Sequence, residues 1–106
     1  GLVTFRIEDD ECEIVTIDST AEGTGVGSAL IGAVKDAAVS AQCKRLWLIT
    51  TNDNTAALRF YQKRGFILVA VYPNALEQAR RLKPELPFIG KDGIPLRDEI
   101  ELEMRL

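Results

Sequence analysis

The sequence predicts an α/β (α+β) domain in which helices pack on a mixed β-sheet, in the order β-β-α-β-α-β-(α)-β. The chain opens with two runs of alternating β-forming residues, and two helical patterns then alternate with apolar, strand-like runs. A strand–helix–strand crossover of this kind joins parallel strands with right-handed connectivity. The 106 residues, of which 46% are hydrophobic and 27% are charged, suffice for one core. We therefore expect a single domain over residues 1–106.

The first half of the chain predicts a hairpin followed by a helix and a buried strand. Leu2–Ile7 and Glu13–Asp18 are rich in β-forming residues, and the acidic residues between them predict a turn. Ser28–Gln42 gathers apolar residues at helical spacing. Arg45–Thr51 is a short apolar run bounded by polar residues, which is typical of a buried strand.

The second half of the chain begins with a helix that the sequence brackets at both ends. Asn54 is a good N-cap, and Gly65 is a good residue for the position just after a helix. The run Phe66–Tyr72 is apolar almost throughout, which predicts a central strand covered on both faces, and Pro73 ends it.

A short helix and a final strand complete the prediction. Asn74 is expected to cap a helix that runs to Lys83, where two prolines stop it. A loop with glycine and proline then leads to the last strand, in which apolar and charged residues alternate up to Leu106.

Composition and charge exclude several classes of function. The formal net charge of −3 and the absence of a basic run argue against nucleic-acid binding. The chain has no histidine and its two cysteines lack metal-ligand spacing, so we expect no metal and no histidine-based triad. No apolar run reaches the length of a membrane span and no cleavable leader is visible, so we expect a cytoplasmic protein without a membrane partner. The two acidic clusters, near residues 8–13 and 98–103, are interpreted as solvated faces.

Three glycines stand at alternate positions ahead of the first helix: Gly23, Gly25 and Gly27. Glycine lets a ligand approach the backbone closely, and the first N–H groups of a helix have no internal partner, so together they favour an anion site. A tight turn between strand and helix is the simpler alternative, and one glycine would serve it. The P-loop is excluded because no Gly-Lys-Ser/Thr follows the glycines. The dinucleotide-binding fingerprint is excluded because it needs two residues between its second and third glycines, and this chain has only one, between Gly25 and Gly27.

The segment from Glu22 to Ser28 resembles the acetyl-CoA loop of the GCN5-related N-acetyltransferase (GNAT) family. The family pattern, Arg/Gln-x-x-Gly-x-Gly/Ala, falls on Glu22, Gly23, Thr24, Gly25, Val26 and Gly27. Glu22 departs from the usual arginine or glutamine, and a carboxylate beside a pyrophosphate is unfavourable, so this departure bears on the affinity for CoA.

A second motif resembles the same family independently. The family has asparagine, small residues, an aromatic–tyrosine pair and Gly-Phe, and this chain matches with Asn54, Ala56, Ala57, Phe60, Tyr61, Gly65 and Phe66. The resemblance runs from Glu13 to the C-terminus and implies a GNAT-like mixed sheet with helices on both faces. It also implies that the strands Glu13–Asp18 and Arg45–Thr51 splay apart.

The resemblance implies a place for acetyl-CoA, the cosubstrate. The pantetheine arm pairs with the backbone around Val15 and Ile17, and the pyrophosphate rests on the N–H groups of Gly23 to Ser28. Asn54 contacts the pantetheine arm, and Ala57 lines the same site.

The implied reaction is acetyl transfer to a primary amine of a small molecule or peptide. Tyr61 matches the family's usual general acid, and a helix tyrosine that only packs on the sheet is the alternative. The general base is open: Glu11 and Glu13 both fall near the family's glutamate, Glu13 shares strand parity with Val15 and Ile17, and water is a third candidate.

The chain lacks the strand, helices and strand that precede the hairpin in family members. Leu2–Ile7 is therefore expected to present an exposed edge with bare apolar residues. We expect a homodimer or larger assembly in which a neighbour covers this strand; the alternative is a shortened form of a longer protein. Because the missing helices form a wall of the acceptor site, a CoA-binding or interaction module without turnover is the alternative function.

Overall fold

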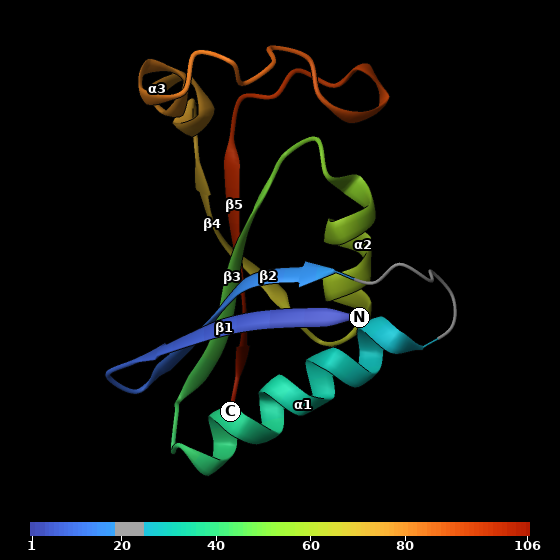
Figure 1. The fold of residues 1–106 in the computed structure, drawn as a ribbon, viewed down its shortest axis with the longest axis vertical. Helices are drawn as coiled ribbons and strands as arrows, with labels where there is room; N and C mark the ends of the chain where they lie inside the picture. The colour runs from blue at the N-terminus through green and yellow to red at the C-terminus, as the bar shows by residue number, and fades with distance from the viewer. Residues whose placement is uncertain (19–24) are drawn as a thin grey trace. The chain divides into compact units, whose positions relative to one another are not determined.

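Nine elements are formed in the computed structural model, which describes residues 1–18 and 25–106 (Figure 1). They are β1 (Leu2–Glu8), β2 (Glu11–Asp18), α1 (Val26–Ser40), β3 (Arg45–Thr51), α2 (Thr55–Lys63), β4 (Ile67–Tyr72), α3 (Ala75–Leu82), a short 3-10 turn (Lys91–Gly93) and β5 (Glu99–Arg105). The strands form one sheet in the order β1-β2-β3-β5-β4. β1 and β2 are antiparallel, whereas β2 and β3 are parallel. The predicted element order and the mixed sheet are confirmed.

The chain divides into two compact units. One comprises Gly1–Leu48 together with Glu103–Leu106, and the other comprises Ile49–Leu102. β3 and β5 each contribute residues to both units. The expectation of a single domain over residues 1–106 stays a prediction.

In the first unit α1 packs against β1 and β2. Its buried positions, Gly27, Ile31, Val34 and Ala38, recur every three or four residues, as expected for one helix face. From the hairpin side Cys12 and Ile14 are buried, and these alternate along β2 with residues of the opposite face. Burial of one such aliphatic side chain stabilises the fold by about 1.5–3 kcal/mol.

The bounds of α1 differ from the predicted Ser28–Gln42 by two residues at each end. At the C-terminus the N–H of Cys43 donates to the carbonyl of Ala38 (2.9 Å), and the N–H of Gln42 donates to that of Val39 (2.9 Å). Gln42 adopts a left-handed φ of 62° between them. This is the Schellman arrangement with glutamine in the position usually held by glycine, so no local residue signal predicts it.

In the second unit α2 has both of its predicted caps. The Asn54 side chain accepts a hydrogen bond from the N–H of Ala57, and Gly65 has a φ of 98°. The N–H of Phe66 donates to the carbonyl of Tyr61 (3.1 Å), which is the same helix-ending pattern as in α1. The Phe66 and Tyr61 rings also meet edge to face, at 5.4 Å between centroids.

The prediction that Phe66–Tyr72 is a covered central strand is wrong. β4 lies at an edge of the sheet because β5 takes the place between β3 and β4. Its apolar side chains are exposed by 41 to 57%, as for Ile67, Leu68, Val69, Val71 and Tyr72. An apolar run marks a strand, but its place in the sheet depends on a later segment of the chain.

The predicted capping of α3 by the Asn74 side chain is also wrong. Asn74 precedes the helix with a φ of 61° and makes no side-chain cap. Its own N–H instead donates to the carboxylate of Asp98 at 2.8 Å. The partner stands 24 residues away, so no local pattern could reveal it.

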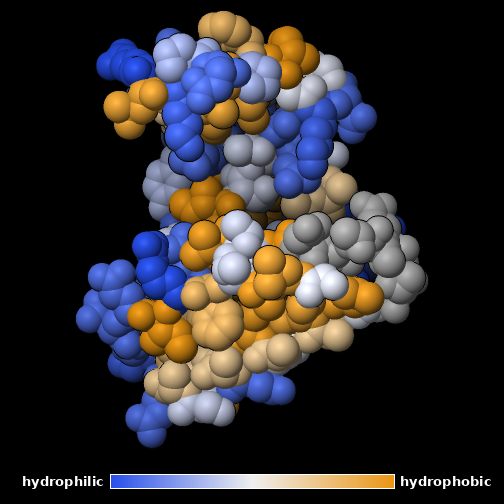
Figure 2. Space-filling view, in the orientation of Figure 1, coloured by the Kyte–Doolittle hydropathy of each residue, from blue (hydrophilic) through white to orange (hydrophobic). Residues whose placement is uncertain are grey.

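β1 forms the other edge of the sheet, as predicted. Its residues Leu2, Phe5 and Ile7 are exposed, and apolar residues gather over the region of β1 and α1 in Figure 2. None of the helices in the described ranges is both long and apolar enough to cross a membrane.

Candidate functional site

The start of α1 carries the described part of the glycine motif. Gly25 precedes the helix with a φ of 83° and accepts a hydrogen bond from the N–H of Ala29 at 3.0 Å. Among the described residues, no heavy atom lies within 4 Å of a Cβ built on Gly25. The N–H groups of Val26 and Gly27 begin the helix and have no acceptor within it. Glu22, Gly23 and Thr24 lie outside the described residues.

The prediction that Glu13, Val15 and Ile17 share one face of β2 is wrong, because a β-bulge interrupts the strand. Phe5 pairs with Ile14 and Thr4 with Thr16, so Val15, which is 54% exposed, is skipped in the ladder and the alternation of faces shifts there. Ile17 pairs with Val3 and lies on the face of Ile14, whereas Glu13 lies on the opposite face. Among the described residues, pairing with β3 covers only Glu11–Arg45, Cys12–Leu46 and Glu13–Trp47. β2 continues to Asp18 beyond the last of these pairs, so its backbone from Ile14 onward is not used by this parallel ladder.

Glu13, a candidate general base, is ion-paired in this structure. Its carboxylate accepts a hydrogen bond from the Arg6 guanidinium at 2.6 Å, and the two residues are opposite each other in the β1–β2 ladder. Arg6 is well exposed, whereas Glu13 is largely covered. To take a proton from a substrate, Glu13 would have to give up or share this partner.

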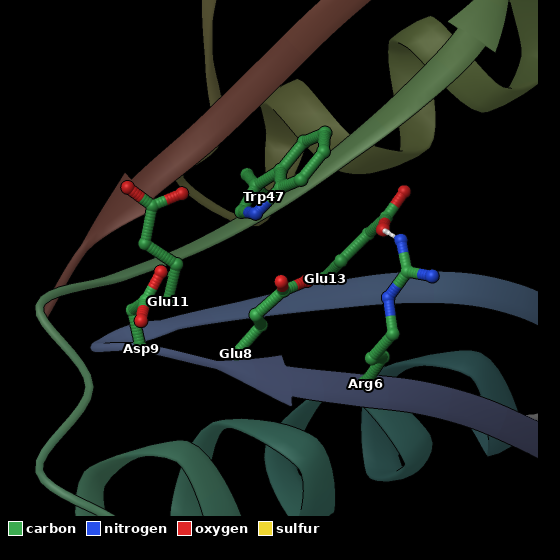
Figure 3. A pocket seen from close by; sticks show the side chains of 6 residues that line it. All are labelled: Arg6, Glu8, Asp9, Glu11, Glu13 and Trp47. Atoms are coloured by element: carbon green, nitrogen blue, oxygen red, sulfur yellow. Dashed lines mark hydrogen bonds and ion pairs between the residues drawn. The ribbon is translucent and has the colours of Figure 1, made fainter.

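The other candidate base, Glu11, belongs to the same pocket. This pocket of about 170 Å³ is lined by Arg6, Glu8, Asp9, Glu11, Glu13 and Trp47 (Figure 3). Glu11 also lies 3.2 Å from the Arg45 guanidinium. Four carboxylates face one lining arginine, so the pocket is acidic. The sequence interpretation of this cluster as a solvated turn overlooked the pocket, because nothing local predicts that Trp47 of β3 lies beside the hairpin.

Arg45 of β3 contacts two residues that line this pocket, Glu11 and Trp47, and joins β2, β3 and β5. Its guanidinium lies 2.8 Å from the Glu103 carboxylate on β5 and 4.9 Å from the ring centroid of Trp47. Largely buried ion pairs of this kind fix geometry more than they add stability. Here the pair holds Trp47 and the start of β3 in place.

Ala57 and Tyr61 lie on α2 and Asn54 is its N-cap, at spacings of three and four residues that bring side chains onto one helix face. The Tyr61 side chain is only 5% exposed and packs edge to face with Phe60 and Phe66. Burial raises the pKa of the Tyr61 hydroxyl, which keeps the phenol protonated at neutral pH. Its hydroxyl makes no hydrogen bond within the described part of the chain.

Asp53 is a buried carboxylate that the sequence analysis missed. It is 5% exposed and accepts hydrogen bonds from the Thr51 hydroxyl and the Lys91 N–H. Burial acts to raise the pKa of Asp53, but these hydrogen bonds outweigh it and the pKa lies below its ordinary value. The Asn-Asp-Asn run at 52–54 was the available signal, and only Asn54 was singled out from it.

The two cysteines play no part in these arrangements. Cys12 and Cys43 are both buried and free. Burial, and next the neighbouring Cys43, raise the pKa of the Cys12 thiol, so it is poorly suited to act as a nucleophile.

Comparison with known proteins gives consistent matches. The family model for the acetyltransferase (GNAT) family matches residues 1–66. The uncharacterized proteins YdhI and YxbD of Bacillus subtilis (strain 168) are 52% identical over 100 residues and 46% identical over 106 residues. The matched regions cover 94% and 100% of this chain, and 62% and 67% of those proteins. The chain thus spans about two thirds of the length of these relatives.

Solved structures share the fold. A Bacillus subtilis acetyltransferase in complex with CoA superposes with a TM-score of 0.80 at 22% identity, covering 98% of this chain and 67% of that one. A GNAT family acetyltransferase from Elizabethkingia anophelis with acetyl-CoA bound has the same TM-score and coverage at 26% identity. Since the family model matches more than half of the residues and two relatives are about half identical, this chain belongs to the GNAT acetyltransferase family.

Proposed function

We propose that the protein is an acetyl-CoA-dependent N-acetyltransferase that acts on a primary amine of a small molecule or peptide. The observation that carries the proposal is the start of α1, where Gly25 has a left-handed φ of 83° and the first N–H groups of the helix have no acceptor within it. Family membership supports it, as do the two similar structures that hold CoA or acetyl-CoA.

The described residues suit acetyl-CoA as a substrate. The pyrophosphate would bind the N–H groups at Gly25 to Ser28, together with those of Gly23 and Thr24. The backbone of β2 around Val15 and Ile17 would pair with the pantetheine arm, because it lies beyond the last pair with β3. Asn54 and Ala57 would contact the same arm from the start of α2.

Tyr61 would act as the general acid. A neutral amine attacks the thioester carbonyl carbon, the new C–N bond forms, and the C–S bond then breaks. The Tyr61 hydroxyl gives its proton to the departing thiolate, and burial keeps that proton in place at neutral pH. The products are the N-acetylated amine and CoA. A base takes the proton lost by the amine: Glu13, Glu11 or water.

The acidic pocket supports a cationic amine as the acceptor. Its carboxylates would raise the local concentration of an ammonium ion. Glu13 lies in this pocket and precedes Val15 and Ile17 along β2, so an amine bound there would lie next to the strand segment proposed to bind acetyl-CoA. The same carboxylates disfavour loss of the ammonium proton, which makes a base necessary.

The experiment begins with acetyl-CoA binding and then measures turnover. A ligand that binds only the folded protein stabilises it by about 2.7 kcal/mol at 100 times its Kd, so acetyl-CoA should raise the midpoint of thermal unfolding. Release of free CoA is then followed with cationic, neutral and anionic amines, and we expect cationic ones to be favoured.

The outcomes separate the candidate functions. Turnover with an amine supports the acetyltransferase. Stabilisation by acetyl-CoA without turnover by any amine supports the alternative, a CoA-binding or interaction module. No stabilisation at high acetyl-CoA concentration would overturn both.

A further inference from the structure

We propose that Asp53 is a positioning residue of the acetyl-CoA site. Asp53 holds Lys91, and Lys91 fixes the orientation of the Asn54 side-chain amide. In this orientation the NH₂ group of Asn54 can donate a hydrogen bond to the cosubstrate. The inference rests on the proposed function and adds Asp53, Gly90 and Lys91 to it. All of these residues lie within the unit Ile49–Leu102.

The first step is the burial of the Asp53 carboxylate. Taking a carboxylate out of water is costly unless hydrogen bonds compensate. Here one oxygen accepts from the Thr51 hydroxyl at 2.5 Å and the other from the N–H of Lys91 at 2.9 Å. The bond to Lys91 spans 38 residues of sequence and ties the segment 88–98, called the 88–98 loop below, to the start of α2.

The second step is the close contact between Asp53 and Gly90. A Cβ on Gly90 would lie 2.1 Å from the Asp53 Oδ2 and 2.9 Å from its Cβ. The φ of Gly90 is −99°, a value open to residues with a side chain, so it is this contact that requires glycine. Asp53 and the 88–98 loop are thus fitted to each other with no room between them.

The third step is the anchoring of the rest of the loop. The N–H of Gly90 donates to the carbonyl of Ile94 at 2.8 Å, which closes the loop tip on itself. The Asn52 side chain donates to the carbonyl of Pro95 at 2.8 Å and accepts from the N–H groups of Arg97 and Asp98. The loop is therefore tied to Asn52 and Asp53, and Lys91 leaves it from a fixed backbone position.

The fourth step joins Lys91 to Asn54. The ammonium of Lys91 donates to the Oδ1 of Asn54 at 3.3 Å, and the N–H of Ala57 donates to the same oxygen at 3.3 Å. Two donors on one oxygen define which way round the amide stands, since its NH₂ group cannot accept from either. The NH₂ group makes no hydrogen bond to the described residues, so it is available to a carbonyl oxygen.

This arrangement has a chemical purpose in the proposed site. The pantetheine arm contains two amides, each with a carbonyl that accepts and an N–H that donates. Because the Asn54 oxygen already accepts from Lys91 and Ala57, its NH₂ group is the part that would bond to the arm, through one of these carbonyls. A free asparagine amide presents either. Asp53, through the backbone of Lys91, keeps the ammonium where it selects the productive orientation.

The experiment compares the KM for acetyl-CoA in four variants. Lys91→Met removes the ammonium, Asp53→Asn weakens the hold on the loop, and Gly90→Ala forces the loop away from Asp53. Each should raise this KM by about fivefold, the equivalent of one net hydrogen bond, while kcat at saturation changes less than twofold. Asn54→Asp keeps the capping oxygens and removes the NH₂ group, and it should raise the same KM.

The decisive measurement is the double variant. In the Asn54→Asp background there is no amide to orient, so adding Asp53→Asn or Lys91→Met should produce no further rise in KM. A purely structural role for Asp53 would give the same rise in both backgrounds. Lys83→Met, the same change at an exposed lysine, and Gly32→Ala, where a Cβ meets nothing within 4 Å, are the matched controls and should leave KM unchanged.

If the wild-type protein binds acetyl-CoA, two results would overturn this inference and leave the proposed function standing. The first is an unchanged KM for acetyl-CoA in Lys91→Met and Asp53→Asn. The second is full additivity of either change with Asn54→Asp. A wild-type protein that does not bind acetyl-CoA would instead remove the proposed function, and the inference with it. Asp53→Asn keeps the size of the side chain, so the test stands even if Gly90→Ala fails to fold.

Discussion

The Tyr61 side chain has a tightly packed ring and a hydroxyl without a hydrogen-bond partner among the described residues. Its ring is packed between Phe60 and Phe66, and its hydroxyl makes no bond to the described residues. Burial raises the pKa of that hydroxyl. The ring is thus fixed by packing, and the proposed general-acid role uses a hydroxyl that no described residue engages.

Tyr61→Phe should lower kcat by about 100-fold, the lower range for loss of a general acid. The two ring contacts remain, so the free energy of unfolding should change by less than about 1 kcal/mol. Steady-state release of CoA and thermal unfolding measure the two effects. Tyr72→Phe is the control, because the Tyr72 hydroxyl donates to Glu101 at an exposed site. An equal loss of kcat in both variants would remove the general-acid role.

The pH profile provides a second check on Tyr61. A raised pKa means that the stability contributed by the neutral phenol is present below the ordinary pKa of 10.0 and is lost as the pH rises through the folded value. Activity that depends on the phenol proton should follow the same alkaline limb. The Tyr61→Phe variant should lack this limb in both activity and stability.

At the scale of elements, the start of α1 is the part that the proposed activity depends on most. Gly25 makes the turn into the helix possible at a φ of 83°, and none of the described residues occupies the space in which a side chain would stand. A side chain there would be tolerated by the protein itself apart from its backbone strain. It would, however, fill the space proposed for the pyrophosphate.

Gly25→Ala and Gly25→Asn separate the backbone strain of a side chain at this position from its effect on acetyl-CoA binding. Alanine in the left-handed region costs roughly 1–2 kcal/mol, whereas asparagine adopts it more readily. The two variants should therefore differ in the midpoint of thermal unfolding but show a similar loss of acetyl-CoA affinity, measured by calorimetry. If affinity follows stability and not the presence of a Cβ, the helix start does not bind the pyrophosphate.

Local signals in the sequence determined how well each element could be predicted. Arg45–Thr51 was predicted with the observed bounds because polar residues flank it, and α2 because Asn54 and Gly65 cap it. The strand β4 was predicted, but its central place in the sheet and the side-chain cap of α3 were wrong, because the segments that decide them, β5 and Asp98, come later in the chain.

The candidate site follows the same rule. The candidate residues on β2, on α1 and around α2 were named from the resemblance of two motifs to the GNAT family, and the bulge at Val15 could not be foreseen from strand parity. Trp47 in the pocket and the contact of Asp53 with Gly90 could not be foreseen either, since they depend on which distant segments meet.

At the scale of the whole molecule, the sheet has two edges, β1 and β4, and both carry exposed apolar residues. Edges of this kind favour pairing with another chain. We propose a homodimer or larger assembly in which a second copy covers β1.

Ile7→Lys should shift the assembly to monomers, since a lysine on an edge strand opposes pairing. Ile7 is 41% exposed in β1, so the fold itself should tolerate the change. Light scattering at several protein concentrations measures the mass. Leu82→Lys on α3, where the side chain is 88% exposed, is the control. A wild-type protein that is monomeric throughout would refute the proposal.

The path of the chain has a practical consequence. The second unit is inserted into the first between Leu48 and Glu103, so the C-terminal residues return to the unit in which the chain began. There the Glu103 carboxylate meets Arg45, and the N–H of Leu106 donates to the carbonyl of Lys44. A protease that nicks the loop after α3 would therefore produce two fragments that remain associated, and the same loop is a natural place to split the gene for a complementation assay.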